Sequence, residues 1–386
     1  MIFRGGRVFA FASAGAAYLT LVAGGLLPLA ADGVEKALAK AAMLIVFICL
    51  FALSKHRRST IQPIAIFTAV GMVIGIALLT RTTNTAFAVD KIDGAIICAA
   101  AVALLLRQGY DVYGQQTFLS SFLWWSFAVL VATVAYKLQA GFFDRGVRFL
   151  LNGPIVYGWL MGFCSLLAYH IWHTKRKPVF GGLFFAFLLG LIWTESKGSL
   201  LAFLAGLLLY VALNARESLR RSLPVIAVFF AVLYFLFDAV QLFLQDSRLS
   251  AIARIFAGEL SATDEGSVGM RSLLADIALD QFAAHPLFGI GLGNFRYGEY
   301  LYPHNQHLEM FAEGGVFVGS LHLLFIAIAF ARADALHKSV LVLFFVASSF
   351  SGDASYLRFL YAFSLLALLP RPSIAAPVTH GRLAGK

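Results

Sequence analysis

Two basic side chains and one histidine have the chemistry to act on an anionic substrate. Arg271 is a permanently charged guanidinium, Lys197 is an ammonium, and His304 is an imidazole that titrates near neutral pH. Guanidinium and ammonium groups bind phosphate, and a neutral imidazole can accept a proton from a hydroxyl group. These three residues can act together only if the elements around them bring them to one place.

Arg271 begins a predicted helix that runs to Ala284 and is stopped by Pro286. One face of this helix is apolar and the opposite face is polar; the apolar residues are Leu274, Ile277, Ala278 and Phe282, and the polar ones are Ser272, Asp276 and Asp280. Arg271 lies within or beside the apolar face, where a guanidinium needs an anionic partner. Either a phosphate group or an acid of the membrane domain fits, and the side chain could also snorkel to water.

His304 lies in the segment Tyr302-Pro-His-Asn-Gln-His307-Leu-Glu-Met-Phe-Ala-Glu313-Gly-Gly, where we expect a helix to begin. A histidine at this boundary can accept a proton, or it can simply cap or anchor the helix. His304 and His307 could also share a helix face and bind a metal ion, but the third ligand that a zinc site requires is not evident beside them.

Lys197 lies in a short turn between two apolar runs, in the segment Trp193-Thr-Glu195-Ser-Lys-Gly. We predict that this turn lies on the outer side of a membrane, where short segments disfavour basic residues. Its presence there indicates either an anionic ligand or an ion pair with Glu195. Several further cations are predicted on the same side and would suit an anionic lipid headgroup: Arg81, Arg145, Arg148 and Arg358.

Three glycines alternate with apolar residues in His285-Pro-Leu-Phe-Gly-Ile-Gly-Leu-Gly-Asn-Phe295. A dinucleotide-binding loop needs a surrounding βαβ unit, which this sequence lacks, so we exclude nucleotide binding. Glycines in this pattern instead let a loop lie close against helices.

The composition indicates that lipid is the solvent for most of the chain. Of its 386 residues 60% are hydrophobic and 13% are charged, and the mean hydropathy is +0.82. The net charge of +10 sits in short clusters between apolar runs, which is typical of membrane topology signals. Nucleic acid is therefore not an expected partner, whereas membrane lipid is.

We predict an all-α, polytopic transmembrane bundle of about 12 spans, because only helices satisfy their backbone in hydrocarbon when apolar runs are this continuous. The predicted spans are 8–30, 37–53, 61–80, 88–106, 118–136, 153–171, 179–194, 198–214, 223–245, 306–331, 338–351 and 355–369. This divides the chain into spans 1–9 (1–245), an outer loop (246–305), spans 10–12 (306–370) and a tail (371–386).

The basic residues predict the orientation. With both termini in the cytoplasm, 17 of the 30 Lys and Arg residues are cytoplasmic, and nine lie in short outer segments. The loop 246–305 is then outside the cytoplasm. Within it we expect an amphipathic helix on the membrane surface over 248–260, a turn-rich break over 263–269, and the Arg271 helix.

The stretch from Arg271 through the glycine segment to His304-Asn305 and Glu313-Gly-Gly resembles the O-antigen ligase/polymerase family. Ser196-Lys197-Gly198 is similar to the Ser-Arg-Gly that this family carries before a transmembrane helix. The resemblance covers residues 193–320 and has two departures. Lys197 stands where the family has arginine, and Ala275 stands where it often has an aromatic residue.

The resemblance implies inverting, metal-independent glycosyl transfer at the periplasmic face of the bacterial inner membrane, without a cofactor. The donor would be a glycan on undecaprenyl diphosphate. A ligase passes it to a lipid A–core sugar hydroxyl, whereas a polymerase of O-antigen or exopolysaccharide passes it to a growing glycan. By this resemblance His304 is the general base and Arg271 and Lys197 hold the diphosphate, with Asn305 and Arg81 as supporting residues.

Three alternatives remain beside the ligase. The motifs do not separate ligase from polymerase, although the single modest outer loop favours the ligase. Transfer of an oligosaccharide to a protein acceptor is a further possibility within the family. A transporter of the lipid-linked glycan should show an internal repeat and charges along a central path, and the sequence shows neither.

Overall fold

The computed structural model describes residues 6–24, 26–27, 34–52, 58–142, 144, 146–150, 152–214 and 262–370. Every named element in these ranges is a helix, and the described residues contain no β-strand beyond two isolated bridges. The predicted all-α class is therefore confirmed for this part of the chain. The expected ninth span (223–245), the surface helix (248–260) and the tail (371–386) lie outside the described residues.

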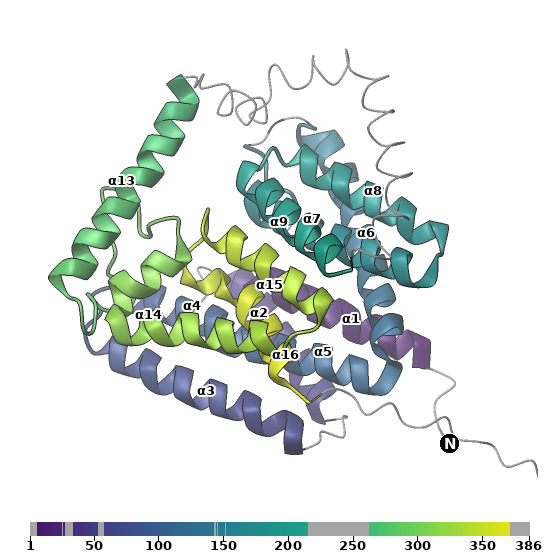
Figure 1. Cartoon of the computed structure of the whole chain (residues 1–386), viewed down its shortest axis with the longest axis horizontal. Helices are drawn as coiled ribbons and strands as arrows, with labels where there is room; N and C mark the ends of the chain where they lie inside the picture. The colour runs from purple at the N-terminus through teal and green to yellow at the C-terminus, as the bar shows by residue number, and fades with distance from the viewer. Residues whose placement is uncertain are drawn as a thin grey trace, which may run out of the picture.

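The helices pack mostly side by side into one bundle, with α13 reaching away from it (Figure 1). In chain order they are α1 (Gly6–Ala23), α2 (Val34–Ala52), α3 (Arg58–Leu79), α4 (Thr85–Ile92), the π-helix η2 (Asp93–Cys98), α5 (Ala99–Tyr113), α6 (Gln115–Ala140), α7 (Pro154–Lys175), α8 (Pro178–Trp193), α9 (Lys197–Leu213), α13 (Ala262–Ala284), α14 (Gln306–Arg332), α15 (Ala335–Ser348), the 3₁₀ turn η3 (Ala354–Tyr356) and α16 (Leu357–Leu368).

Four of these helices are long and apolar enough to cross a membrane: Thr60–Leu79, Gln115–Ala140, Pro154–Lys175 and Gln306–Arg332. Six shorter apolar helical stretches accompany them. Within the described ranges each predicted span falls on a helix. These features support a helical membrane protein, and the number of spans stays a prediction.

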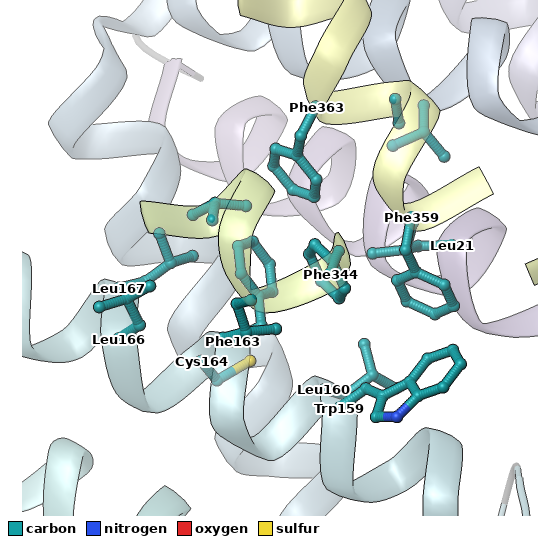
Figure 2. Close-up of a cluster of buried hydrophobic side chains, with 14 of the residues drawn as sticks. Leu21, Trp159, Leu160, Phe163, Cys164, Leu166, Leu167, Phe344, Phe359 and Phe363 are labelled. Carbon is teal, nitrogen blue, oxygen red and sulfur yellow. The ribbon is translucent and has the colours of Figure 1, made fainter. Parts of the chain in front are cut away.

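The core is built of aromatic rings around α7 (Figure 2). Phe163 of α7 lies 4.9 Å from Phe363 of α16 between ring centroids, and Phe363 in turn stacks on Phe344 of α15 at 5.6 Å. Trp159, one turn before Phe163, contacts Phe359 edge-on at 5.9 Å. Edge-on and offset ring pairs of this kind stabilise a core beyond their buried area. They fix α15 and α16 against α7, and so fix the turn that joins α15 to α16.

The predicted turn-rich break over 263–269 is wrong, because α13 is helical from Ala262 onward. The segment contains two glycines, Gly266 and Gly269. Each glycine lowers helix stability by only about 1 kcal/mol relative to alanine, and the segment contains no proline to interrupt the helix. The predicted end of this helix at Ala284 is confirmed.

Candidate active site

His304 is the residue immediately before the N-cap of α14. Asn305 is the N-cap, and its side-chain oxygen accepts hydrogen bonds from the backbone N–H groups of His307 and Leu308 at 3.1 Å each. His304 itself has a left-handed backbone with φ = 56°. That conformation is uncommon for a residue other than glycine and occurs disproportionately at functional sites. Asn305 therefore has a structural role as a helix cap, directly beside the imidazole.

The imidazole of His304 is packed among aromatic rings. The ring of Tyr302 lies 4.5 Å away between centroids, and that of Tyr300 lies 6.0 Å away. Nδ1 of His304 is buried, and no protein atom in the described ranges forms a hydrogen bond with it.

Burial lowers the pKa of His304 below its usual 6.5, and the positive charge of Arg271 lowers it further. The carboxylate of Asp353 partly offsets both effects. The imidazole is therefore neutral at pH 7, which is the state that can accept a proton. Because their charges shift this pKa, Arg271 and Asp353 both lie close enough to His304 to interact with its imidazole electrostatically.

Arg271 reaches this neighbourhood because α13 packs on the first turns of α14. Leu274 and Ala278 of α13 are buried against Phe295 and Ala312. Asp276 and Asp280 are exposed on the other side of the helix, as the apolar-face pattern predicts. Arg271 is half-buried, so the predicted position on the buried side is confirmed.

Lys197 is the first residue of α9. The turn 349–353 packs against this end of α9 and also against the start of α14. Ser196 caps α9 by accepting a hydrogen bond from the N–H of Ser199 at 3.4 Å. A Cβ atom on Gly198 would lie 2.8 Å from Cβ of Phe350, so α9 begins directly against the turn 349–353. In the same turn, the carbonyl of Ser351 accepts a hydrogen bond from the Gln306 amide at 2.9 Å.

Arg81 lies in the turn between α3 and α4 and contacts the glycine segment. Its guanidinium donates to the carbonyl of Gly289 at 3.3 Å, and its own carbonyl accepts from the Asn294 amide at 2.8 Å. Asn294 also accepts from the backbone N–H of Thr83 at 2.8 Å. These contacts make Arg81 a support for the glycine segment.

The glycine segment lies against a break in α14, as its close-packing pattern predicts. Gly315 has φ = 69° and interrupts the helix, and the carbonyls of Ala312 and Glu313 accept hydrogen bonds from Ile290 and Gly291 at 2.9 and 3.0 Å. A Cβ atom on Gly289 would lie 2.4 Å from the carbonyl carbon of Glu313. Only glycine permits this approach, since Gly289 also has φ = 65°.

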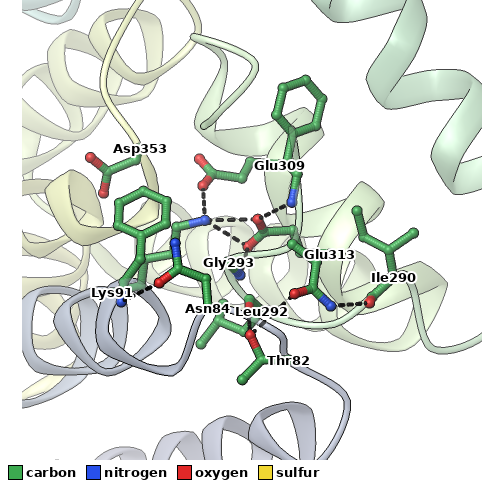
Figure 3. Close-up of polar contacts among 12 residues, drawn as sticks. Thr82, Asn84, Lys91, Ile290, Leu292, Gly293, Glu309, Glu313 and Asp353 are labelled. Atoms are coloured by element: carbon green, nitrogen blue, oxygen red, sulfur yellow. Dashed lines mark hydrogen bonds and ion pairs between the residues drawn. The ribbon is translucent and has the colours of Figure 1, made fainter. Parts of the chain in front are cut away.

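A buried ion network that we did not predict joins this break to α4 (Figure 3). Nζ of Lys91 lies 2.6 Å from Glu309 and 2.7 Å from Glu313, and all three side chains are at most 2% exposed. Glu313 also accepts hydrogen bonds from the N–H groups of Gly293 and Phe295 at 2.9 and 3.2 Å. The available signals were a lysine inside an apolar run and two glutamates four residues apart on one helix face.

The two glutamates of this network differ in the number of hydrogen-bond donors that reach their carboxylates. Glu313 has two backbone donors besides Lys91, which suits an ionised carboxylate. Among the described residues, neither Glu309 oxygen has a hydrogen bond of good geometry, although one lies within ion-pair distance of Lys91. Two carboxyl groups thus share one ammonium away from water.

The metal alternative for His304 and His307 does not match their arrangement. His304 precedes the helix, while Nδ1 of His307 lies 2.8 Å from Nε2 of His322 and Nε2 of His307 lies 3.0 Å from the carbonyl of Phe345. A carbonyl can only accept, so Nε2 of His307 carries a proton and its Nδ1 accepts from His322. Nδ1 of His322 then accepts from the Tyr361 hydroxyl at 2.7 Å.

Arg358 was predicted on the outer side among cations that would suit a lipid headgroup, and its burial contradicts the headgroup contact. Its side chain is 2% exposed, and it donates to the carbonyls of Leu21 and Ser355 at 2.7 and 3.1 Å. The guanidinium also stacks on the ring of Tyr356. Arg358 therefore joins α16 to α1, because a buried guanidinium is tolerated when backbone carbonyls satisfy it.

An apolar cavity of about 480 Å³ lies between α3, η2, α14 and α16. It extends along α3 from Gln62 to Leu78, and Lys91 lines it together with Leu292 of the glycine segment. At 1.5 Å per residue, this stretch of α3 is roughly 24 Å long, which is close to the ~30 Å thickness of membrane hydrocarbon. The apolar lining of the cavity suits a hydrocarbon chain.

Residues 182–323 match the family model described as O-antigen ligase. This range contains the stretch 193–320 on which the sequence resemblance rests, and the match confirms that resemblance for these residues. It includes Lys197, Arg271 and His304. No curated relative matches the sequence.

Proposed function

We propose that this chain, assigned to the O-antigen ligase family through residues 182–323, is an O-antigen ligase. The family supports glycosyl transfer of the ligase or polymerase type. The finer proposal is transfer of a glycan from undecaprenyl diphosphate to a lipid A–core sugar hydroxyl. The site would face the periplasm from the bacterial inner membrane, with both termini in the cytoplasm and residues 246–305 forming the catalytic loop.

The observation that carries this proposal is the neutral, half-buried His304 within the electrostatic reach of Arg271. An acceptor hydroxyl must lose a proton as it attacks, and the neutral imidazole of His304 is the base that would receive it. The departing diphosphate gathers negative charge, which fixed cations in a dry site stabilise. We assign the first requirement to His304 and the second to Arg271, two residues from different elements that interact electrostatically.

In the proposed reaction the acceptor oxygen attacks the anomeric carbon of the donor sugar. The bond from that carbon to the diphosphate oxygen breaks, and its electron pair leaves with the diphosphate held by Arg271 and Lys197. The proton of the acceptor hydroxyl goes to His304. A single displacement of this kind inverts the configuration at the anomeric carbon, and it requires neither a metal ion nor a cofactor.

The starts of α9 and α14 support an anionic leaving group near Lys197 and His304. Helix N-termini carry a partial positive charge that favours phosphate. The turn 349–353 contacts both helix ends through Phe350 and Ser351. The apolar cavity along α3 supports a donor with a long hydrocarbon chain, because its lining is almost entirely apolar.

The decisive test measures glycan transfer in membranes that contain His304→Ala. We expect transfer to fall by at least about a hundredfold, since general-base catalysis typically contributes that much or more. His337→Ala, a change at the start of α15, is the matched control and should retain activity. Normal transfer by His304→Ala at equal protein levels would exclude His304 from the mechanism.

Arg271→Lys tests the phosphate contact separately. Lysine keeps the charge but loses the planar fork of donors, so transfer should fall if the guanidinium binds the diphosphate through two hydrogen bonds. Full activity of Arg271→Lys would contradict that form of binding.

The lipopolysaccharide of a deletion strain separates ligase from polymerase. Loss of the ligase leaves a bare lipid A–core and an accumulation of full-length glycan on its lipid carrier. Loss of a polymerase instead leaves a core that carries a single repeat, and that result would reject the ligase proposal.

A further inference from the structure

Three tyrosines lie in the short segment between the glycine loop and His304. The segment folds into a small hairpin, in which the backbone N–H of Tyr297 donates to the carbonyl of Tyr300 and the N–H of Tyr300 donates back, both at 2.9 Å. Gly298 has φ = 56°, a conformation that suits the tight turn between them. The hairpin therefore holds the tyrosine positions in a defined arrangement.

Both ends of the hairpin are fixed to the protein. Before it, Phe295 is fully buried and its N–H donates to Glu313 at 3.2 Å. After it, Pro303 is buried and Asn305 caps α14. A segment of seven residues between two such anchors has little freedom to move away from His304.

The three tyrosines differ in exposure. Tyr302 is half-buried with its ring on His304, and burial raises its pKa to about 12, so its phenol stays protonated at neutral pH. Tyr297 and Tyr300 are 43% and 36% exposed. Tyr300 nevertheless keeps its ring 6.0 Å from that of His304, at an interplanar angle of 72°. Tyr300 thus places an exposed aromatic ring beside the proposed base, and the backbone of the hairpin joins Tyr297 to Tyr300.

We propose that Tyr297 and Tyr300 form a platform that binds the acceptor sugar. This inference rests on the proposed function, because it assumes that a sugar hydroxyl gives its proton to His304. It concerns recognition of the acceptor and not the transfer step, so Tyr297 and Tyr300 are binding residues.

The chemistry of a sugar ring fits this surface. A pyranose has an apolar face of C–H groups and a rim of hydroxyls, and an aromatic ring is complementary to the apolar face. Tyrosine offers a large, rigid contact area with few rotatable bonds and a hydroxyl that can bind the rim. Arg296 and Glu299, which directly precede the two tyrosines in the chain, are exposed, and their side chains can donate to or accept from sugar hydroxyls.

The position next to His304 distinguishes this platform from an aromatic belt at the membrane surface. Tyrosine is common at membrane interfaces, where it anchors a protein by contact with headgroups. An anchor acts equally on all substrates, whereas a platform beside the base acts on the acceptor alone. Loss of an anchor should therefore change the KM values for donor and acceptor alike, whereas loss of a platform should change the acceptor KM alone.

The experiment uses the full-length protein reconstituted in vesicles. Lipid A–core that lacks O-antigen is varied at saturating donor to obtain the acceptor KM, and the donor is varied at saturating acceptor to obtain the donor KM. We expect Tyr300→Ala to raise the KM for this acceptor about tenfold, equivalent to ~1.4 kcal/mol of binding, with the donor KM unchanged. Tyr300→Phe keeps the ring and should stay within about threefold of the natural protein. Tyr136→Ala removes a tyrosine of similar exposure, 39%, from α6 and should change neither KM.

Two results would overturn the platform. One is an unchanged acceptor KM in both Tyr297→Ala and Tyr300→Ala; the other is an equal rise in both KM values, which would indicate anchoring. If the natural protein transfers no glycan, the proposed function fails, and direct binding of the core oligosaccharide then decides the platform. Equal Kd values for the natural protein and Tyr300→Ala reject it, and a Kd about tenfold higher in Tyr300→Ala supports it.

Discussion

Lys91 and Glu313 are 222 positions apart in the sequence and meet in a buried contact of 2.7 Å between Nζ and Oε1. Lys91 belongs to α4, and Glu313 lies two residues before the break at Gly315 in α14. Because Glu313 also accepts from Gly293 and Phe295, this contact joins α4, α14 and the glycine segment at one point. The contact therefore lies about two turns into α14, the helix that begins just after His304.

Lys91→Met should destabilise the protein strongly. It leaves Glu309 and Glu313 buried without their cation, and loss of one partner of a buried pair typically costs about 3–5 kcal/mol. The midpoint of thermal unfolding of detergent-solubilised protein checks this, with Lys175→Met at the exposed end of α7 as control. If Lys91→Met unfolds at the natural midpoint, the network does not hold the site together.

Restoring neutrality should recover part of that loss. Lys91→Met combined with Glu309→Gln and Glu313→Gln removes all three charges while keeping similar shapes. A triple variant as unstable as Lys91→Met alone would show that packing, not charge, causes the effect.

Gly289→Ala should disturb the glycine segment by a steric route. Its added Cβ would lie 2.4 Å from the Glu313 carbonyl carbon, and its φ of 65° is unfavourable for alanine. The left-handed backbone costs ~1–2 kcal/mol and the overlap adds ~1–3 kcal/mol. We expect a lower unfolding midpoint and weaker transfer.

Gly182→Ala is the matched control for this change. Nothing lies within 4 Å of a Cβ atom added at Gly182, which sits inside α8. Because alanine favours a helix over glycine, the control should keep or slightly raise stability. Equal loss in both variants would contradict the steric account of Gly289.

Transfer should lose activity at low pH, and this fall in the pH profile, the acid limb, should lie below pH 6.5. Burial and Arg271 lower the pKa of His304, so its neutral form persists to lower pH than usual and activity falls only as pH drops through that lowered pKa. Arg271→Gln removes a positive charge and should move the limb of kcat/KM to higher pH. Asp353→Asn removes a negative charge and should move it to lower pH.

The two opposite shifts test whether Arg271 and Asp353 lie close to the titrating group, and not only whether these residues are needed for transfer. A structural role of Arg271 or Asp353 would change the rate without moving the limb. An acid limb that stays in place in both variants would show that their charges do not act on the group that titrates.

The sequence predicts those parts of the site that depend on local patterns. The apolar face of α13, its end at Ala284 and the close packing of the glycine segment follow from periodicity, a proline and glycine spacing. The helical class follows from long apolar runs. Each of these rests on residues that are neighbours in the chain.

The parts that the sequence does not predict depend on contacts between distant segments. The Lys91 network and the burial of Arg358 require partners from other helices, and no local pattern identifies those partners. The continuation of α13 through Gly269 was also missed, because glycine lowers helix propensity without preventing a helix. Local propensity is therefore a weaker guide than tertiary context at these points.

At position 197 the substitution Lys197→Arg introduces the arginine that the O-antigen ligase family usually has. The structure places Lys197 at the first turn of α9, half-buried, and Gly198 next to it is held against Phe350. If Lys197 binds the diphosphate as a point charge, Lys197→Arg keeps the charge and adds a fork of donors, so transfer should be kept or increased. Lys197→Met removes the charge and should lower kcat/KM about tenfold or more, at protein levels equal to those of the natural chain. Transfer assays with saturating acceptor and varied donor check both changes. A rise in donor KM for Lys197→Met with no rise for Lys197→Arg supports the phosphate contact, and equal donor KM values for all three proteins argue against it.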